Sequence, residues 1–312
     1  MKLAWKKCET ITKRYNISLL AGNNELSATA FNVDRTESTP YKVNIELDRA
    51  TKTSNLYVLS IGINKYKNEK YNLSYGSADA EGFTNLIALR SKGIFNNIKT
   101  EIIKDEDFTK ESVMSKLEAL SKDIRPEDVF VFYYAGHGVM SEGQDGKPSE
   151  FFFIPYNVTQ LYGNDEHLES KGISANELRK AFVNIRAQNQ LIVVDACQSG
   201  GATEMLAMRG AAEEKALMQL ARSAGIAVLS STGTEQLASE VKQLGHGIFT
   251  YSLIEGLSGK ADGGEKDGKI TVKELAAFLE DNVPELTKKY RGTTQYPNTS
   301  IRGMDFPIVV WK

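Results

Sequence analysis

Two stretches decide the fold: residues 129–138 read VFVFYYAGHG, and residues 191–201 read LIVVDACQSGG. Each begins with a run of apolar, β-branched or aromatic residues, which is typical of a strand buried on both faces of a parallel sheet. Each run ends at a reactive side chain with glycine close behind it. Because such runs alternate with helical segments along most of the chain, we predict an α/β fold with a mostly parallel central sheet flanked by helices.

The two predicted strand ends carry an imidazole and a thiol. In open α/β sheets, ligands bind beyond the carboxyl ends of the strands, so we expect His137 and Cys197 to meet at that edge. A thiol becomes a good nucleophile as its thiolate, and a nearby imidazole can take its proton. The amides of Gly138 and Cys197 are the expected donors to the oxyanion of a tetrahedral intermediate. The pattern indicates a cysteine hydrolase. The alternative is a structural pair, but purely structural residues do not need flanking glycines.

A strand that ends in Gly-His-Gly, followed by one that ends in Asp-x-Cys-x-Ser-Gly, resembles the caspase-like peptidases, specifically their bacterial metacaspase-like (orthocaspase) branch. Animal caspases carry Gln where this chain has Asp195, and Ser199 here precedes the glycine. The resemblance runs from about Asn55 to the C-terminus and includes residues 245–251 (GHGIFTY) and 295–297 (QYP). It implies a three-layer sandwich with a catalytic Cys–His dyad.

Two acidic residues bear on substrate preference. Asp195 lies two residues before Cys197, so its side chain leaves the strand on the same side as the thiol. Asp79 follows the loop after the first predicted strand, at the same edge of the sheet. The resemblance implies that acids at these positions line the pocket for the residue before the cleaved bond, and hence that cleavage follows Arg or Lys. The alternatives are an acid in the first turn of a helix for Asp79 and an acceptor for loop amides for Asp195.

The chain divides into two predicted parts. Residues 25–31 and 41–47 have the alternating pattern of half-buried strands. We interpret residues 1–54 as a short β segment, the remnant of an immunoglobulin-like sandwich with a linker, and residues 55–312 as the peptidase domain. In the second part, strands are expected at residues 56–63, 99–103, 129–137, 191–197, 226–231 and 306–310. Helices are expected at residues 77–89, 109–121, 174–185, 203–224, 248–255 and 271–289, the last kinked or broken near Pro284.

The remaining histidines and the second cysteine are expected to play no part in catalysis. His246 precedes a predicted helix and is interpreted as structural, His167 lies in a predicted polar loop, and Cys8 lies outside the pattern. Residues 262–274 partly match a calcium-binding loop. Aligning Gly268 with the invariant glycine of that loop puts Gly263 where the first carboxylate ligand belongs. We therefore expect a solvated turn there, with a calcium site as the alternative, and no other metal or cofactor.

Composition excludes several functional classes. The chain has 38 basic and 40 acidic residues and a net charge of −2, which gives no support for binding to nucleic acid or to an anionic membrane. It has no run approaching the roughly 20 apolar residues of a membrane helix, and its start lacks the apolar core of a signal peptide. Two cysteines in unlike contexts predict a reducing, cytoplasmic setting.

The favoured interpretation is a cysteine endopeptidase that acts on protein or peptide substrates, with a regulatory domain expected upstream. One alternative is a catalytically silent caspase-fold module that binds peptides or serves as a scaffold. Another is an amidase or thioesterase on a different α/β fold. Arg209, Lys215 and Arg222 lie in a segment where family members can be cut during activation, so self-processing is a further hypothesis.

Overall fold

The computed structural model describes residues 12–14, 17, 19–30, 32, 36–49, 52–143, 149–198, 226–231, 240–264, 266–301 and 303–312. The chain divides into two compact units, Met1–Lys52 and Thr53–Lys312. In the first unit, β1 (Gly22–Ala28) and β2 (Tyr41–Leu47) form an antiparallel pair, so both predicted strands are present, the first beginning three residues earlier than expected. Their residues are mostly exposed, whereas half-buried strands were expected. The origin of this pair in an immunoglobulin-like sandwich stays a prediction.

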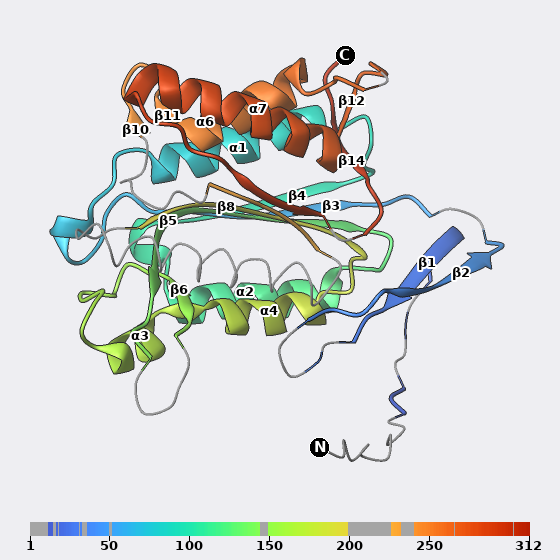
Figure 1. Ribbon diagram of the computed structural model, residues 1–312, viewed down its shortest axis with the longest axis horizontal. Coiled ribbons are helices and arrows are strands. Elements are labelled where there is room, and N and C mark those ends of the chain that lie inside the picture. Colours follow the sequence, from blue (N-terminus) through green and yellow to red (C-terminus); the bar gives the residue numbers. More distant parts are fainter. Residues whose placement is uncertain are drawn as a thin grey trace, which may run out of the picture. The chain divides into compact units, whose positions relative to one another are not determined.

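The second unit is built on an eight-stranded, mostly parallel sheet (Figure 1). Its main path runs in the order β13-β9-β8-β5-β3-β4, and the predicted central strands occupy the middle of it. β3, β4, β5, β8 and β9 are parallel to their neighbours, whereas β13 is antiparallel to β9 at the edge. The strands span β3 (Leu56–Gly62), β4 (Ile98–Lys104), β5 (Val129–Met140), β8 (Asn189–Gln198), β9 (Ala227–Ser230) and β13 (Asn298–Ile301). The predicted sheet is thereby confirmed.

Helices cover both faces of this sheet, which completes the predicted three layers (Figure 1). One face carries α1 (Gly76–Arg90), α6 (Ile248–Glu255) and α7 (Val272–Arg291), and the other carries α2 (Lys110–Asp123) and α4 (Ala175–Asn184). Thr109, Ser174 and Thr271 each begin a helix with a reciprocal capping box, which fixes where α2, α4 and α7 start. The helix expected at residues 203–224 lies outside the described residues.

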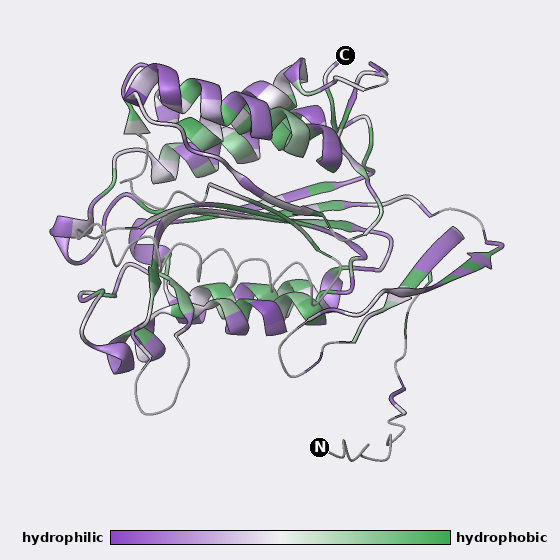
Figure 2. Cartoon of the chain, viewed as in Figure 1, coloured by the Kyte–Doolittle hydropathy of each residue, from purple (hydrophilic) through white to green (hydrophobic). Residues whose placement is uncertain are grey.

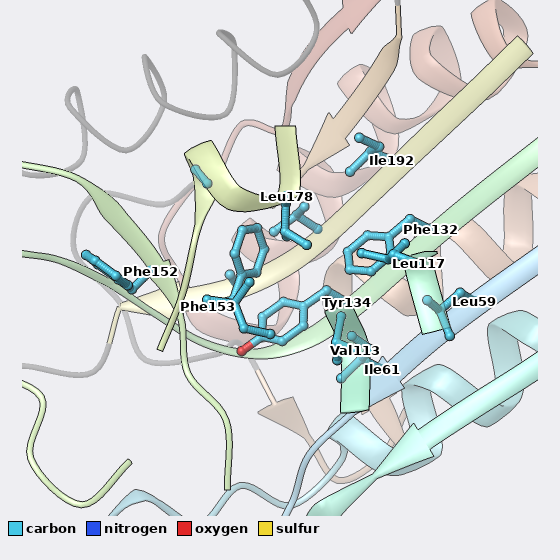
Figure 3. Packing of buried hydrophobic residues seen from close by; sticks show 14 of the residues in the cluster. Leu59, Ile61, Val113, Leu117, Phe132, Tyr134, Phe152, Phe153, Leu178 and Ile192 are labelled. Carbon is cyan, nitrogen blue, oxygen red and sulfur yellow. The ribbon is translucent and has the colours of Figure 1, made fainter. Parts of the chain in front are cut away.

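Alternate residues of the central strands pack on opposite layers. Leu59, Phe132 and Ile192 face α2 and α4, where Leu117 and Leu178 meet them (Figure 3). Their neighbours, such as Val58, Val131 and Val193, pack toward α1, α6 and α7. Each such side chain contributes roughly 1.5–3 kcal/mol when it is fully buried. Figure 2 shows the result: hydrophobic strands lie between helices that turn hydrophilic residues outward.

Strand β5 is longer than predicted. It continues past His137 to Met140 instead of ending beside that histidine, because β6 (Phe151–Phe153) pairs antiparallel with residues 138–140. The glycines permit close packing at this point rather than an open loop. A Cβ atom at Gly138 would lie 2.3 Å from the Phe151 ring, and one at Gly136 would lie 2.6 Å from the Tyr134 hydroxyl.

Two further expectations are corrected, and one is confirmed. Helix α7 is not broken at Pro284 but continues through it, with buried Val283 and Thr287 on either side of the proline. The expected last strand is present as β14 (Pro307–Val310), which pairs with β12 (Lys269–Thr271). His167 lies in the first turn of α3 (Asp165–Lys171), half-buried, because Asn164 caps a helix there.

Short segments complete the described chain. β7 (Ile173–Ser174) pairs with β6, and β10 (Glu240–Val241) pairs with β11 (His246–Gly247). The helical turns η1 (Glu69–Tyr71), η2 (Asp105–Asp107) and η3 (Gly256–Lys260) lie in the connections. No helix among the described residues has the length and apolar character needed to cross a membrane.

Candidate active site

The two residues predicted to react lie side by side on neighbouring strands. β5 and β8 are parallel, and their register pairs His137 with Cys197. Paired strands in a sheet run about 4.8 Å apart, so the two main chains are adjacent at these residues. The side chain of Cys197 lies outside the described part of the chain, as do residues 199–225 with the segment proposed for self-processing.

His137 is held firmly from several directions. Its side chain is buried, and its Nε2 lies 2.7 Å from the main-chain oxygen of Tyr71. Its amide donates to the Tyr66 hydroxyl over 2.9 Å, and its carbonyl accepts from the Tyr134 hydroxyl over 2.6 Å. The Tyr66 ring also lies against the imidazole, with 5.0 Å between centroids.

The Tyr71 contact decides which nitrogen of His137 carries the hydrogen. A carbonyl oxygen can only accept, so Nε2 is the donor and the lone pair of the neutral ring resides on Nδ1. Nδ1 is then the atom that can take a proton, and the ring is oriented by a third group, as in other nucleophile–base pairs. Tyr71 belongs to η1, a segment without any sequence motif that would indicate a functional atom.

The two predicted pocket acids come together at one residue, Gly247. Its amide lies 3.2 Å from each carboxylate oxygen of Asp79. A Cβ atom at Gly247 would lie 3.1 Å from Asp195 Oδ2 and 3.2 Å from Asp79 Oδ2. Asp79 comes from α1, Asp195 from β8 and Gly247 from β11, so the fold assembles this acidic pair from three distant segments.

Each acid has a further partner that the sequence did not suggest. His246 Nδ1 lies 2.7 Å from Asp79 Oδ1. The hydroxyl of Thr250, in α6, donates to Asp195 Oδ2 over 2.6 Å and lies 2.6 Å from the Tyr133 hydroxyl. Helix α1 has Tyr75 at its N-cap, and the Asp79 carboxylate bonds to β11 rather than to the amides of its own helix. Asp79 is therefore directed toward β11 and does not cap α1.

Burial controls the protonation of Asp79. The residue is only 4% exposed, and this desolvation raises the pKa of its carboxyl from 3.8 to about 6, with a smaller contribution from the charge of Asp195. The hydrogen bonds from His246 and Gly247 act in the opposite direction. Two acids held close together in a protein interior are costly to ionise, and such arrangements concentrate at functional sites.

The remaining predicted positions are the oxyanion donors, Cys8 and the calcium-like loop. Gly138 lies within β5, opposite Gln198 of β8 and Phe153 of β6. The oxyanion role of the Gly138 and Cys197 amides stays a prediction, and Cys8 is outside the described residues. Asp262, at the start of the calcium-like loop, is buried and accepts from the Gly268 amide and from Trp311 Nε1. Within the described ranges, no three His, Cys, Asp or Glu side chains are arranged to hold a metal ion.

Comparison with known proteins gives the family. The caspase-domain model of the peptidase C14 family matches residues 56–305. Among solved structures, protein GSU0716 from Geobacter sulfurreducens is similar, with a TM-score of 0.54 and 16% identity over 80% of this chain and 94% of that one. At that identity the likeness concerns the fold alone. A search of curated proteins gives no significant match. With the family model covering most of its length, and a buried His137 paired in register with Cys197, the chain belongs to the caspase family of cysteine peptidases.

Proposed function

We propose that this caspase-family chain is an endopeptidase in which Cys197 is the nucleophile, His137 is the base, and cleavage follows Arg or Lys. The observation that carries the proposal is the register of His137 beside Cys197, together with the 2.7 Å contact that leaves the lone pair on Nδ1. A buried histidine with a purely structural role would not need to lie beside the chain's one cysteine in the peptidase domain.

The reaction follows the ordinary course for a thiol nucleophile. His137 takes the proton of the Cys197 thiol, and the thiolate attacks the carbonyl carbon of the scissile bond. The amides of Gly138 and Cys197 stabilise the resulting oxyanion. The imidazolium returns its proton to the leaving amine, which departs and leaves a thioester. Water, deprotonated by His137, then hydrolyses the thioester and restores the thiol. These steps need no metal, because the thiolate is the nucleophile.

The preference for basic residues rests on Asp79 and Asp195. Two carboxylates converging on Gly247, one of them strongly desolvated, offer a guanidinium or ammonium group charge-assisted hydrogen bonds. A cation between them would also offset the cost of ionising a buried acid beside another acid. This pocket and the Asp-x-Cys-x-Ser-Gly sequence together favour the metacaspase-like branch. A nucleophilic thiol suits a reducing compartment, and we propose a cytoplasmic setting with protein or peptide substrates.

The test is hydrolysis of internally quenched peptides, blocked at both ends, that carry Arg, Lys or Asp before the cleaved bond. We expect turnover after Arg and Lys, and loss of turnover in Cys197→Ala and His137→Ala. Blocked ends make cleavage diagnostic of an endopeptidase rather than of an amidase. Turnover after Asp alone would overturn the pocket assignment and leave the peptidase in place. Binding of the basic peptides without turnover would favour the silent module instead.

A further inference from the structure

His246 lies at the edge of the acidic pair and is supported by the surface of α1. Its Nδ1 contacts Asp79, while a Cβ atom at Gly82 would lie 2.9 Å from its Cε1 and 3.4 Å from its Nε2. Asp79 and Gly82 are three residues apart and therefore share one face of the helix. The imidazole thus lies along α1, in space that glycine leaves, with its polar edge toward the carboxylate.

His246 and Asp79 differ in how far their side chains are exposed to solvent. The side chain of His246 is 24% exposed, whereas that of Asp79 is 6% exposed. Solvent can therefore deliver a proton to the histidine, while the carboxylate that the histidine contacts stays inside. Histidine is the side chain whose ordinary charge change falls between pH 5 and 8. The pair consequently places a group that can become positive beside the acid proposed to bind a cation.

Among the described residues, the groups that contact Asp79, Asp195 and His246 come from five elements. Asp79 belongs to α1, Asp195 to β8 and His246 to β11, while α6 contributes the uncharged Thr250 and β5 the hydroxyl of Tyr133. With both acids ionised and the imidazole neutral, this set carries two negative charges. Protonating the imidazole halves that net charge and puts a cation within hydrogen-bond distance of Asp79.

We propose that His246 is a third, specificity-determining residue of the pocket. As a neutral imidazole it donates from Nδ1 and holds the Asp79 carboxylate in place for a substrate Arg or Lys side chain. As an imidazolium it competes with that side chain for the same carboxylate. This inference rests on the proposed function, because it requires the pocket to receive a basic residue.

The raised pKa of Asp79 also supports a pH-dependent affinity of the pocket for a cation. Even with His246 as a partner, burial raises the pKa of Asp79 to about 6, so this carboxyl takes up a proton more readily than a solvated one. The pair can take up two protons, and each of them opposes the binding of a cation.

The test measures how many protons are released when a peptide ending in Arg binds the Cys197→Ala variant. Calorimetry in buffers of different ionisation enthalpy gives this number. Cys197→Ala is compared with Cys197→Ala/His246→Asn, because an asparagine amide can replace the Nδ1 donor but cannot become charged. At pH 5.5 we expect the variant that keeps His246 to release more protons than the double variant, and to lose affinity more steeply below pH 7. Each proton released corresponds to about ten-fold in affinity per pH unit. At pH 7.5 the two affinities should agree within about three-fold.

His246→Ala tests positioning, since it removes the donor and should weaken peptide binding at pH 7.5, where His246→Asn does not. His167→Asn is the matched control, because this half-buried histidine contacts the Thr159 amide and not the pocket. It should leave the proton count unchanged. Equal proton counts with and without His246, in protein that still binds the peptide, would overturn the inference alone. Failure of wild type to cleave after Arg or Lys, together with no peptide binding at any pH, would overturn the proposed function as well.

Discussion

The Nε2 atom of His137 lies 2.7 Å from the main-chain oxygen of Tyr71, in a segment more than sixty residues earlier. The same segment contributes the Tyr66 hydroxyl, which accepts from the amide of His137 over 2.9 Å. The imidazole is therefore positioned by two contacts from one connection, between β3 and α1. That connection is held in turn by hydrogen bonds such as Tyr66 N to Asn72 Oδ1 and Lys67 N to the Tyr156 carbonyl.

Tyr66→Phe tests this positioning. The substitution removes the acceptor of a buried amide, which costs about 1–3 kcal/mol in the free energy of unfolding. We also expect a lower kcat with little change in KM, because the imidazole loses part of its orientation and the pocket is untouched. Urea denaturation and peptide kinetics measure the two effects. Tyr71→Phe is the matched control: Tyr71 acts through its main-chain oxygen, so kcat should stay near that of wild type.

Gly247→Ala tests whether the substrate side chain binds between Asp79 and Asp195. The backbone at Gly247 has φ −61° and ψ 146°, which alanine adopts readily, so the fold should be retained. The new methyl group would lie 3.1 Å and 3.2 Å from oxygens of Asp195 and Asp79, in the space proposed for the substrate cation. We expect kcat/KM for Arg peptides to fall on the order of ten-fold or more, because small misplacements at a reacting site are costly.

The matched control for that substitution is Gly245→Asn. Gly245 has φ +67°, a conformation that asparagine tolerates, and nothing lies within 4 Å of a Cβ atom there. Its kinetics should resemble those of wild type. If Gly247→Ala hydrolysed Arg peptides as well as wild type does, the space between the carboxylates would not be where the substrate side chain binds.

Much of the fold was predictable, because buried strands and capped helices depend on local residue patterns. The apolar runs before His137 and Cys197 indicated the parallel sheet, and the helix expected from residue 174 is α4, which Ser174 caps. Strand β13 was missed because its residues, Asn298–Ile301, are largely polar and pair only at the edge. The extension of β5 depends on Phe151 packing over Gly138, a contact between segments that no single stretch of sequence encodes.

The candidate site was predictable where side-chain chemistry marks it, and not elsewhere. His137, Asp195 and Cys197 are reactive or charged residues that follow apolar runs, and Asp79 is an acid in the first turn of α1. Tyr71 contributes a main-chain oxygen, which every residue type possesses, so its identity carried no signal. His246 was interpreted as structural because it precedes a helix, and only the fold brings it to Asp79. The available signal for His246 was its place in residues 245–251 (GHGIFTY), which belong to the stretch that resembles the caspase-like peptidases.

Asp79→Asn tests the cost of burying the acid. Because the folded protein holds this proton up to a pKa of about 6, against an ordinary value of 3.8, the folded state binds more protons than the unfolded state between those values. Wild-type stability therefore falls as pH rises from about 4 to 6, and the asparagine variant lacks that decline. The folded and ordinary pKa values of Asp79 differ by about two units, which limits this loss of unfolding free energy to about 3 kcal/mol.

We accordingly expect Asp79→Asn to gain stability relative to wild type as pH rises from about 4.5 to 7.5, measured by urea denaturation, while losing activity on Arg peptides. Such a gain at the expense of activity is the mark of a residue retained for function. Asp267→Asn, at an exposed acid of the second unit, serves as the control and should follow the wild-type pH dependence. Parallel stability curves for wild type and Asp79→Asn would show that the Asp79 proton is not bound more tightly in the folded protein.

Thr250→Val tests the support of the second acid. Valine keeps the shape of threonine but removes the hydroxyl that donates to Asp195 and contacts the Tyr133 hydroxyl. Loss of this buried hydrogen bond should cost about 1–3 kcal/mol in unfolding free energy and raise KM for Arg peptides. Thr84→Val is the control, since Thr84 is likewise buried and bonds to Ser60 within the core. It should lose similar stability and leave KM unchanged. A rise in KM common to both variants would trace to general loosening of the fold, whereas a rise confined to Thr250→Val would place Asp195 in contact with the substrate side chain.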